Sequence, residues 1–279
     1  MATSEIQVNL SSQAADPEAK AFLARRRQQL WRSRSLPAFG VVALLFAWWA
    51  VVAGFHVKPF IAPSPVLVVQ TLFIKSDLLL QNIVPTAIEA AGGFVLGNAV
   101  AILLATLFVH NKSLREIFYP VAVMINSIPV VAKAPILVLI MGNGLEPKIT
   151  IAAIVCFFPT LVNMVRGLEA VNPQAMELMQ ILSASKREIF FKLRLYASLP
   201  YLFSALRIAA SMSVIGAVVG EWIGATQGIG AMIIQATYSF DSALLYTAII
   251  MSAVLSGLFF LVIAALERWL VKWQPASAH

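Results

Sequence analysis

The strongest constraint on the fold is a series of six long apolar segments separated by charged ones. A helix that crosses the hydrocarbon core of a bilayer needs about 20 mostly apolar residues. Inside a bilayer the backbone polar groups must be hydrogen-bonded within the protein, so such segments fold as helices. We therefore expect an all-α membrane protein with about six transmembrane helices. The six segments are Leu36–Phe55, Ile83–Val109, Ile117–Met141, Ile149–Val165, Pro200–Gly220 and Ala243–Leu266.

Composition supports a lipid environment. Of the 279 residues, 60% are hydrophobic and 12% are charged, whereas a soluble domain has about 45–50% apolar and about 25% charged residues. The formal net charge of +7 would suggest a nucleic-acid partner in a soluble protein. Here the positive charges lie between apolar segments, so membrane topology explains them better, and we expect no nucleic-acid partner.

The distribution of Lys and Arg predicts the orientation. If the N-terminus is cytoplasmic, three of the 20 basic residues lie in outer loops (Lys58, Lys75 and Lys148) and two lie within spans (Lys133 and Arg207). The remaining 15 then lie on the cytoplasmic side. Cytoplasmic loops of membrane proteins carry the excess of positive charge. We expect a multi-pass protein of the bacterial inner membrane with both termini in the cytoplasm.

We divide the chain into a basic cytoplasmic segment, residues 1–35, a transmembrane domain, residues 36–273, and a C-terminal tail, residues 274–279. The N-terminal segment lacks the pattern of a signal peptide. Its stretch from Lys20 to Arg34 is expected to form a basic amphipathic helix on the inner leaflet. The alternative for the first 18 residues is a frayed tail.

The cytoplasmic loop 166–199 mixes charged residues with many large apolar ones. A disordered linker would not carry so many large apolar residues. We therefore expect short helices that contact a partner on the cytoplasmic side. The alternative is a helix that packs only on its own transmembrane bundle.

This loop resembles a motif of binding-protein-dependent importer permeases. The motif runs Glu-Ala-Ala, three residues, Gly, and about nine residues before an Ile-x-Leu-Pro end. The spacing and the Glu are kept here, while the Ala pair, the Gly and the first Pro are replaced. The corresponding residues are Glu177-Leu178-Met179, Ser183, Leu193-Arg194-Leu195-Tyr196 and Leu199-Pro200.

Other segments, in the same order along the chain, resemble the nitrate, sulfonate and taurine group of ABC importer permeases. The resemblance implies the type I importer permease fold for residues 36–273. It implies as substrate a small anion such as nitrate, a sulfonate or taurine, or a small heterocycle such as a thiamine-precursor pyrimidine. The segments are Ile61-Ala62-Pro63-Ser64-Pro65, Gly93-Phe94-Val95-Leu96-Gly97, Ile128-Pro129 with Ala134-Pro135, Gly220 to Gly230, and Leu266-Glu267-Arg268-Trp269.

The resemblance also implies partners. Two permease subunits, expected to be two copies of this chain, form the pathway in the bilayer. Two cytoplasmic ATPase subunits bind ATP and Mg, and an extracytoplasmic solute-binding protein delivers the substrate. The chain has no G-x-x-x-x-G-K-[ST] phosphate loop, so we expect no cofactor in it and no enzymatic activity of its own.

Within the loop, apolar residues are expected to enter a groove on the ATPase, while charged residues set the register. Ser183 stands where the motif has Gly, and Ser adopts a tight turn less easily than Gly. Glu177 is expected to pair with a basic group or to cap the loop helices. The expected coupling residues are Glu177, Ser183, Ala184, Ser185, Lys186 and Phe190.

Ionisable residues inside a span are costly and are functional candidates. For the substrate pathway we consider Lys133, Glu89, Glu221 and the neighbouring Trp222. Lys133 either lines the pathway, pairs with Glu221 or Glu89, or extends toward the outer surface. Glu221 either acts at a gate or caps the Gly-rich turn through backbone N–H groups. Arg207 is expected to extend to the cytoplasmic surface or to pair with a carboxylate of the loop.

Two other classes of protein are less consistent with the sequence. A secondary transporter or channel working without an ATPase would need its own coupling-ion site, and there is neither an inverted repeat nor a run of carboxylates within the spans. A membrane enzyme would need a catalytic motif, but His56, His110 and His279 are scattered and neither H-E-x-x-H nor G-x-S-x-G is present. We expect no catalytic and no metal site.

Overall fold

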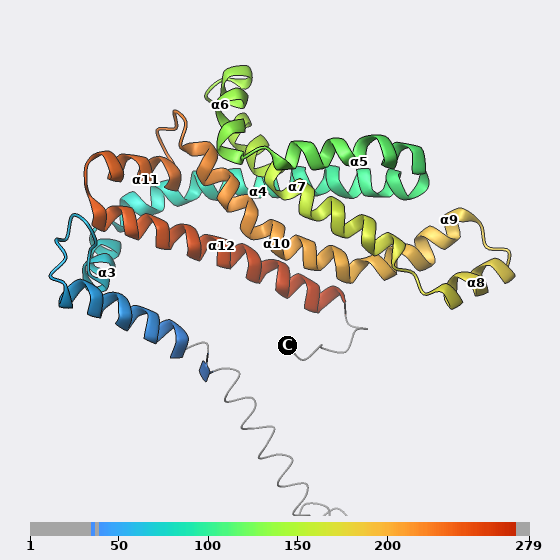
Figure 1. The fold of residues 1–279 in the computed structure, drawn as a ribbon, viewed down its shortest axis with the longest axis horizontal. Coiled ribbons are helices and arrows are strands. Elements are labelled where there is room, and N and C mark those ends of the chain that lie inside the picture. The colour runs from blue at the N-terminus through green and yellow to red at the C-terminus, as the bar shows by residue number, and fades with distance from the viewer. Residues whose placement is uncertain (1–34, 37–38, 272–279) are drawn as a thin grey trace, which may run out of the picture. The chain divides into compact units, whose positions relative to one another are not determined.

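The computed structural model describes residues 35–36 and 39–271, and all regular elements in these ranges are helices (Figure 1). The expected N-terminal helix from Lys20 to Arg34 and the tail 274–279 lie outside the described residues. The chain divides into two compact units, residues 1–66 and 67–279. The first unit contains the apolar helix Phe39–Gly54, which is shorter than the four long spans of the second.

The second unit is a bundle of long helices joined by shorter ones. Four helices are long and apolar enough to cross a membrane: α4, α7, the helix that ends in α10, and α12. They agree with the second, fourth, fifth and sixth predicted spans. The elements are α3 (Pro65–Ile74), α4 (Ser76–His110), α5 (Lys112–Ser127), α6 (Val130–Met141), α7 (Glu146–Glu169), α8 (Pro173–Ile181), α9 (Lys186–Ile189), the π-helix η1 (Phe190–Arg194), α10 (Leu195–Glu221), α11 (Ile229–Tyr238) and α12 (Ser242–Leu270).

The third predicted span is not a straight helix. The segment consists of α5 and α6, which meet at an angle of 100°. The break falls at Ile128-Pro129, and Ile128 has an extended backbone. Proline lacks a backbone N–H and disfavours helical backbone in the residue before it, which explains the break at this position. The pair is one broken span or a re-entrant segment.

Helix α7 packs between α4 and α10 at very short range. A Cβ added to Gly93 of α4 would lie 2.3 Å from the Ala152 Cβ, and one added to Gly216 of α10 would lie 2.6 Å from the Ala152 Cα. Small residues allow this close approach, on which helix association in a membrane depends. The close approach at Gly93 and Gly216 is therefore packing within one chain.

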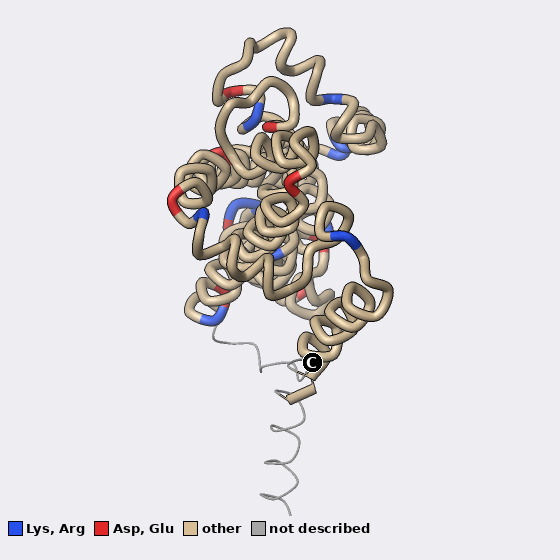
Figure 2. The backbone as a smooth tube through the Cα atoms, turned by 90° about the vertical axis from the view of Figure 1, so that its left-hand side faces the viewer, with Lys and Arg blue, Asp and Glu red and all other residues tan. Residues whose placement is uncertain are grey.

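Many large apolar side chains of the long helices are exposed, as expected for helices that face lipid. On α12, for example, Leu258, Leu261 and Val262 are exposed. In Figure 2 the tube is mostly tan along the helices, because few of their residues are charged. The buried core combines small residues such as Ala90, Ala152 and Ala217 with larger ones such as Leu79 and Ile229.

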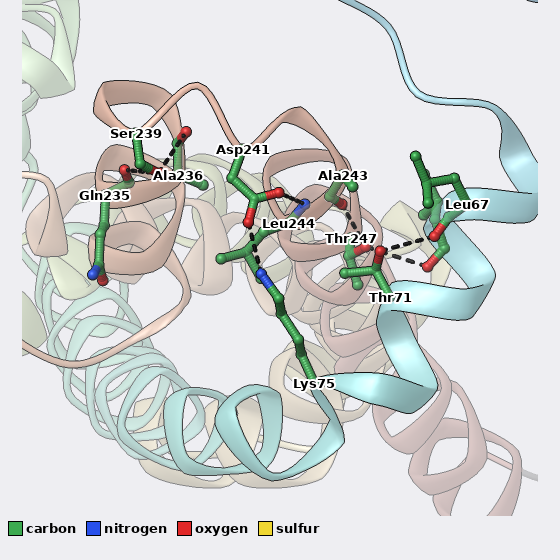
Figure 3. Close-up of polar contacts among 11 residues, drawn as sticks. Leu67, Thr71, Lys75, Gln235, Ala236, Ser239, Asp241, Ala243, Leu244 and Thr247 are labelled. Carbon is green, nitrogen blue, oxygen red and sulfur yellow. Dashed lines mark hydrogen bonds and ion pairs between the residues drawn. The ribbon is translucent and has the colours of Figure 1, made fainter. Parts of the chain in front are cut away.

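A polar clamp joins the start of α4 to the start of α12 (Figure 3). The Lys75 Nζ donates to the Asp241 Oδ2 at 2.6 Å, and the other oxygen of Asp241 accepts the Leu244 N–H at 3.0 Å. Asp241 thus caps α12 while pairing with Lys75. Burial opposes ionisation of Asp241, but the hydrogen bonds and the charge of Lys75 outweigh it, so the pKa of Asp241 is below its ordinary value.

Candidate functional site

The cytoplasmic loop predicted to meet a partner consists of two short helices. Helix α8 begins after Asn172, whose side chain accepts the Gln174 N–H at 2.9 Å. Helix α9 begins after Ser185, whose hydroxyl accepts the Glu188 N–H while the Glu188 carboxylate accepts the Ser185 N–H. This capping box explains the sharp start of α9. The Ser185 N–H and hydroxyl, together with Lys192, hold the pKa of Glu188 below its ordinary value.

Ser183 forms the turn between α8 and α9 in a left-handed conformation, with φ at 53°. The Ser183 N–H donates to the Gln180 O at 2.9 Å, and the Ala184 N–H donates to the Met179 O at 2.9 Å. These two bonds make a Schellman motif, whose left-handed position is usually glycine. The substitution of Ser for Gly therefore keeps the turn and accepts backbone strain at Ser183.

Large apolar side chains of this loop point away from the protein. Ile181 is 79% exposed, Leu182 is 67% exposed and Phe191 is 52% exposed. None of the residues of α8 is buried. Water disfavours the exposure of large apolar side chains, and several of them exposed in one short loop indicate a contact surface. The packing of the loop on its own bundle, the alternative considered above, does not cover these residues.

The expected coupling residues divide into an exposed group and Phe190, which faces the bundle. The exposed group includes Glu177, Ser185 and Lys186, together with Ser183 at the turn. Glu177 lies within α8 and caps neither loop helix, because these roles belong to Asn172 and Ser185.

Phe190 faces the bundle instead of the surface. Its ring lies 4.9 Å from that of His110 at the end of α4 and 5.2 Å from that of Phe191. Phe190 also packs on the apolar cluster of α4, α5 and α7. Of the two neighbouring phenylalanines, Phe191 is the exposed one. Phe190 therefore connects the loop to the transmembrane helices.

The loop leads into the bundle without a break. Helices α9, η1 and α10 form one continuous helix from Lys186 to Glu221, 36 residues long. At 1.5 Å per residue its length is about 54 Å. The π-helical turn at residues 190–194 is the one irregular stretch, and such turns occur often at functional positions. One continuous helix thus joins the exposed loop to the opposite end of the bundle.

At that opposite end Glu221 is 1% exposed and holds the Gly-rich turn. Its Oε1 accepts the Thr86 hydroxyl at 2.6 Å, and its Oε2 accepts the Gly230 N–H at 2.6 Å. The Thr86 hydroxyl accepts the Ile229 N–H at 2.8 Å, and the Asn82 Oδ1 accepts the Gly228 N–H at 2.8 Å. Glu221 thus caps the Gly-rich turn through a backbone N–H group, which is one of the two alternatives predicted for this residue.

Glycine is required in this turn. Gly228 has φ at 113°, and a Cβ there would lie 2.1 Å from the Glu221 Oε1. A residue with a side chain would meet both the strained backbone and the carboxylate. The G-x-G spacing of the sequence therefore follows from the position of the Glu221 side chain.

Glu89 is also buried, at 1% exposure, and its carboxyl group neighbours that of Glu221. Its Oε1 lies 3.3 Å from the Nζ of Lys148 at the start of α7. Its Oε2 is buried and has no hydrogen-bond partner among the described residues. The predicted partner of Glu89, Lys133, is not the one observed.

Lys133 lies on α6 and is partly exposed. Within residues 39–271 it makes no ion pair with Glu89, Glu221 or another acid. Trp222 follows α10 and is 40% exposed. The structure thus brings Glu89 and Glu221 together and leaves Lys133 outside their cluster.

Sequence reasoning missed three members of this cluster, namely Asn82, Thr86 and Lys148. Asn82, Thr86 and the predicted Glu89 follow one another at spacings of four and three residues, which places all three on one face of α4. That spacing was a usable signal. Lys148, in contrast, was assigned to an outer loop because it precedes an apolar segment. Arg207 pairs with Glu267 of α12 at 3.3 Å, not with a carboxylate of the loop.

Comparison with known proteins places these features in context. Residues 97–273 match the family described as "Binding-protein-dependent transport system inner membrane component". The formylaminopyrimidine transport permease protein ThiX of Halalkalibacterium halodurans is 33% identical over 83% of this chain and 93% of its own. The putative aliphatic sulfonates transport permease protein SsuC of Bacillus subtilis is 27% identical over 92% of this chain and 95% of its own.

A solved structure has a similar fold. An inward-facing conformation of the MetNI methionine ABC transporter contains a chain that matches with a TM-score of 0.54 and 23% identity. The match covers 74% of this chain and 97% of that chain. The match shows that the two chains share a fold.

Proposed function

Since this chain belongs to the binding-protein-dependent transport system inner membrane components, the permease subunits of ABC importers, we propose that its α8–α9 loop receives the force of ATP hydrolysis from partner chains. The chain is a component of the inner membrane and is not itself the ATPase. An importer of this kind works with an ATPase and a solute-binding protein as partners.

The finer assembly is part of the proposal. Two cytoplasmic ATPase subunits, each binding ATP and Mg, contact the loops of two copies of this chain. An extracytoplasmic binding protein docks on the other side. Exposed apolar faces of α5 and α6, with Met124, Leu139 and Ile140 among their residues, are available to a second copy or to lipid.

One observation carries the proposal: the loop that exposes large apolar side chains continues directly into a single long helix. Ile181, Leu182 and Phe191 present an apolar surface, and the helix that follows reaches Glu221. A force on the loop would move α10 as a lever. Phe190 and His110 would carry the same motion to α4.

The coupling surface is tested with a charge on its most exposed residue. We expect Ile181→Asp to reduce substrate-stimulated ATP hydrolysis and transport at least tenfold in a reconstituted complex, because a buried unpaired charge prevents docking. Gln180→Asp, on the neighbouring exposed polar position, is the matched control and should have little effect. Equal activity of both variants would refute the docking role of Ile181.

Glu177 tests the same surface through charge. Glu177→Lys should lower transport and ATPase coupling while leaving membrane insertion intact, because a reversed charge disrupts the register of docking. Insertion is measured by the amount of the variant in the membrane fraction. Substrate-stimulated ATPase activity equal to that of the wild type would contradict the assignment.

The substrate is proposed to be a small heterocycle such as a thiamine-precursor pyrimidine, with a small anion such as nitrate, a sulfonate or taurine as the alternative. The pyrimidine permease ThiX is more similar to this chain than the sulfonate permease SsuC, at 33% against 27% identity. Lys133 has no acidic partner among the described residues, and it is proposed to contact a carbonyl or anionic group of the substrate in the pathway. Trp222, which follows Glu221 in the sequence, is proposed to line the same pathway.

The substrate assignment is tested by binding and uptake. The cognate solute-binding protein is titrated with a formylaminopyrimidine and with taurine, and uptake of the bound solute is measured in proteoliposomes. Lys133→Met should reduce uptake with the ATPase still coupled to the loop, while Lys58→Met, in the outer loop after the first predicted span, should not. Uptake unchanged by Lys133→Met would remove Lys133 from the pathway.

A further inference from the structure

A polar cavity of about 290 Å³ lies where four helix ends meet. It lies between the end of α4, the start of α5, the end of α7 and the junction of η1 with α10. By the distribution of Lys and Arg, this level is the cytoplasmic boundary of the membrane. The lining residues are Phe108, Val109, Lys112, Arg115, Glu169 and Arg194.

The cavity carries excess positive charge. Glu169 pairs with Arg115, which leaves Lys112 and Arg194 without an acidic partner within residues 39–271. The Arg194 Nη1 donates to the Leu168 O at 3.4 Å, which orients the guanidinium at the cavity. Two unneutralised cations at the same cavity attract an anion, and a partly enclosed site strengthens that attraction.

An apolar surface begins next to these cations. Phe108 and Val109 line the cavity beside them. On α5, Phe118 follows Arg115 by three residues and Ile125 follows Phe118 by seven, and both apolar side chains are exposed. Residues at these spacings share one face of a helix. One face of α5 therefore changes from cationic at Arg115 to apolar in the direction of the bilayer centre.

This combination selects one kind of ligand. A free inorganic anion would use only the cations, whereas an anionic phospholipid would use the cations and the apolar strip. Basic pockets between helices on the cytoplasmic side of a membrane bind anionic lipid head groups. We propose that this cavity binds the phosphate of an anionic phospholipid of the inner leaflet, with its acyl chain along Phe118 and Ile125.

The bound lipid would lie beside the continuous helix Lys186–Glu221, which is proposed above to act as a lever. Arg194 is the last residue of η1, and Phe190 of the same turn packs on His110. A phosphate held by Arg194 and Lys112 would tie η1 to α5. The lipid would thereby stabilise one position of the helix that leads from the loop to Glu221.

The proposal is tested by native mass spectrometry of the purified full-length protein. Phosphatidylglycerol and phosphatidylcholine are titrated into the detergent-solubilised wild type and into Lys112→Gln and Arg194→Gln. We expect each substitution to weaken phosphatidylglycerol binding about fivefold, the effect of one basic residue near an anionic membrane surface. Binding of phosphatidylcholine should be weaker than that of phosphatidylglycerol and should not change.

Arg268→Gln is the matched control, since it removes a positive charge from the exposed cytoplasmic end of α12. It should leave phosphatidylglycerol binding within twofold of the wild type. Equal binding by wild type and both cavity variants would overturn the proposal, and so would equal affinity for the two lipids. Displacement of the lipid by millimolar inorganic phosphate would show a site for free anions and would overturn the lipid assignment.

Discussion

Ser183 adopts a backbone conformation that glycine adopts more readily. Its φ of 53° lies in the left-handed region, where a residue with a Cβ is less stable by about 1 kcal/mol. The strain is retained at the loop proposed to meet the ATPase. The sequence indicated this position correctly, because Ser stands at the glycine of the motif.

Ser183→Gly should therefore raise the free energy of unfolding by up to about 1 kcal/mol, since it removes the strain at the turn. The measurement is the melting temperature of the detergent-solubilised protein. Ser183→Ala keeps the strain and removes the hydroxyl, so it should leave the melting temperature nearly unchanged. A lower melting temperature for Ser183→Gly would contradict the role of the turn.

Asp241 shows how a single carboxylate serves two purposes. It pairs with Lys75 and caps α12 (Figure 3). Both side chains are about a third exposed, at 37% and 34%, so water screens the pair and its contribution is below about 1 kcal/mol. This pair could not be predicted from the sequence, because Lys75 and Asp241 lie 166 positions apart in the chain.

Asp241→Asn should lower the melting temperature at neutral pH by a small amount, because the amide keeps the cap and loses the charge pairing. The folded-state pKa of Asp241 is below its ordinary value of 3.8. The carboxylate therefore contributes its full stability above pH 3.8, and this contribution is lost as the pH falls through the lowered pKa. The difference between wild type and variant should therefore diminish as the pH falls below 3.8, and a constant difference would contradict this account.

At the scale of elements, the turn before α11 depends on Glu221. Its two carboxylate oxygens accept the Thr86 hydroxyl and the Gly230 N–H. Loss of an acceptor for a buried donor costs about 1–3 kcal/mol. This explains why an acidic residue lies at the end of α10, a position that hydropathy alone would mark as costly.

Glu221→Ala should therefore lower the free energy of unfolding by about 1–3 kcal/mol, measured as the loss of melting temperature in detergent. Glu221→Gln keeps one acceptor and should cost less. Glu146→Ala, at the exposed start of α7, serves as control. A Glu221→Ala variant as stable as the control would show that the hydrogen bonds do not hold the turn.

Elements were predictable where the apolar signal was long and unbroken. The span predicted at Ile149–Val165 falls within α7, and the one at Pro200–Gly220 lies within α10. The prolines Pro129 and Pro135 predict a bend in the third span, Ile117–Met141, but not the extended residue Ile128 that divides this span into α5 and α6. The short helices α8 and α9 were expected only as a class, since their ends depend on capping by Asn172 and Ser185.

At the scale of the whole molecule, the family expected from the motifs is confirmed by the comparisons. The fold class and the family could be predicted from features of this one sequence. The contacts of the site residues could not be predicted in this way, neither the pairing of Lys148 with Glu89 nor the packing of Phe190 on the transmembrane helices. Both depend on packing between segments that are far apart in the chain.

The central claim is that α8 and α9 dock on ATPase partners and that one helix carries the motion to the outer end. The most direct measurement is site-specific cross-linking in native membranes. Cys156 is the chain's one cysteine, and Cys156→Ala provides the background in which single cysteines are introduced at Ile181, Phe190 and Tyr238. Each variant is treated with a short thiol-reactive photo-cross-linker.

We predict a cross-link from Ile181→Cys to the ATPase chain, a weaker one from Phe190→Cys, which faces the bundle, and none from Tyr238→Cys, which is exposed at the end of α11. The Ile181→Cys cross-link should increase or decrease with added ATP, because the loop moves with the ATPase. Absence of an Ile181→Cys product, or an equal yield from Tyr238→Cys, would contradict the account.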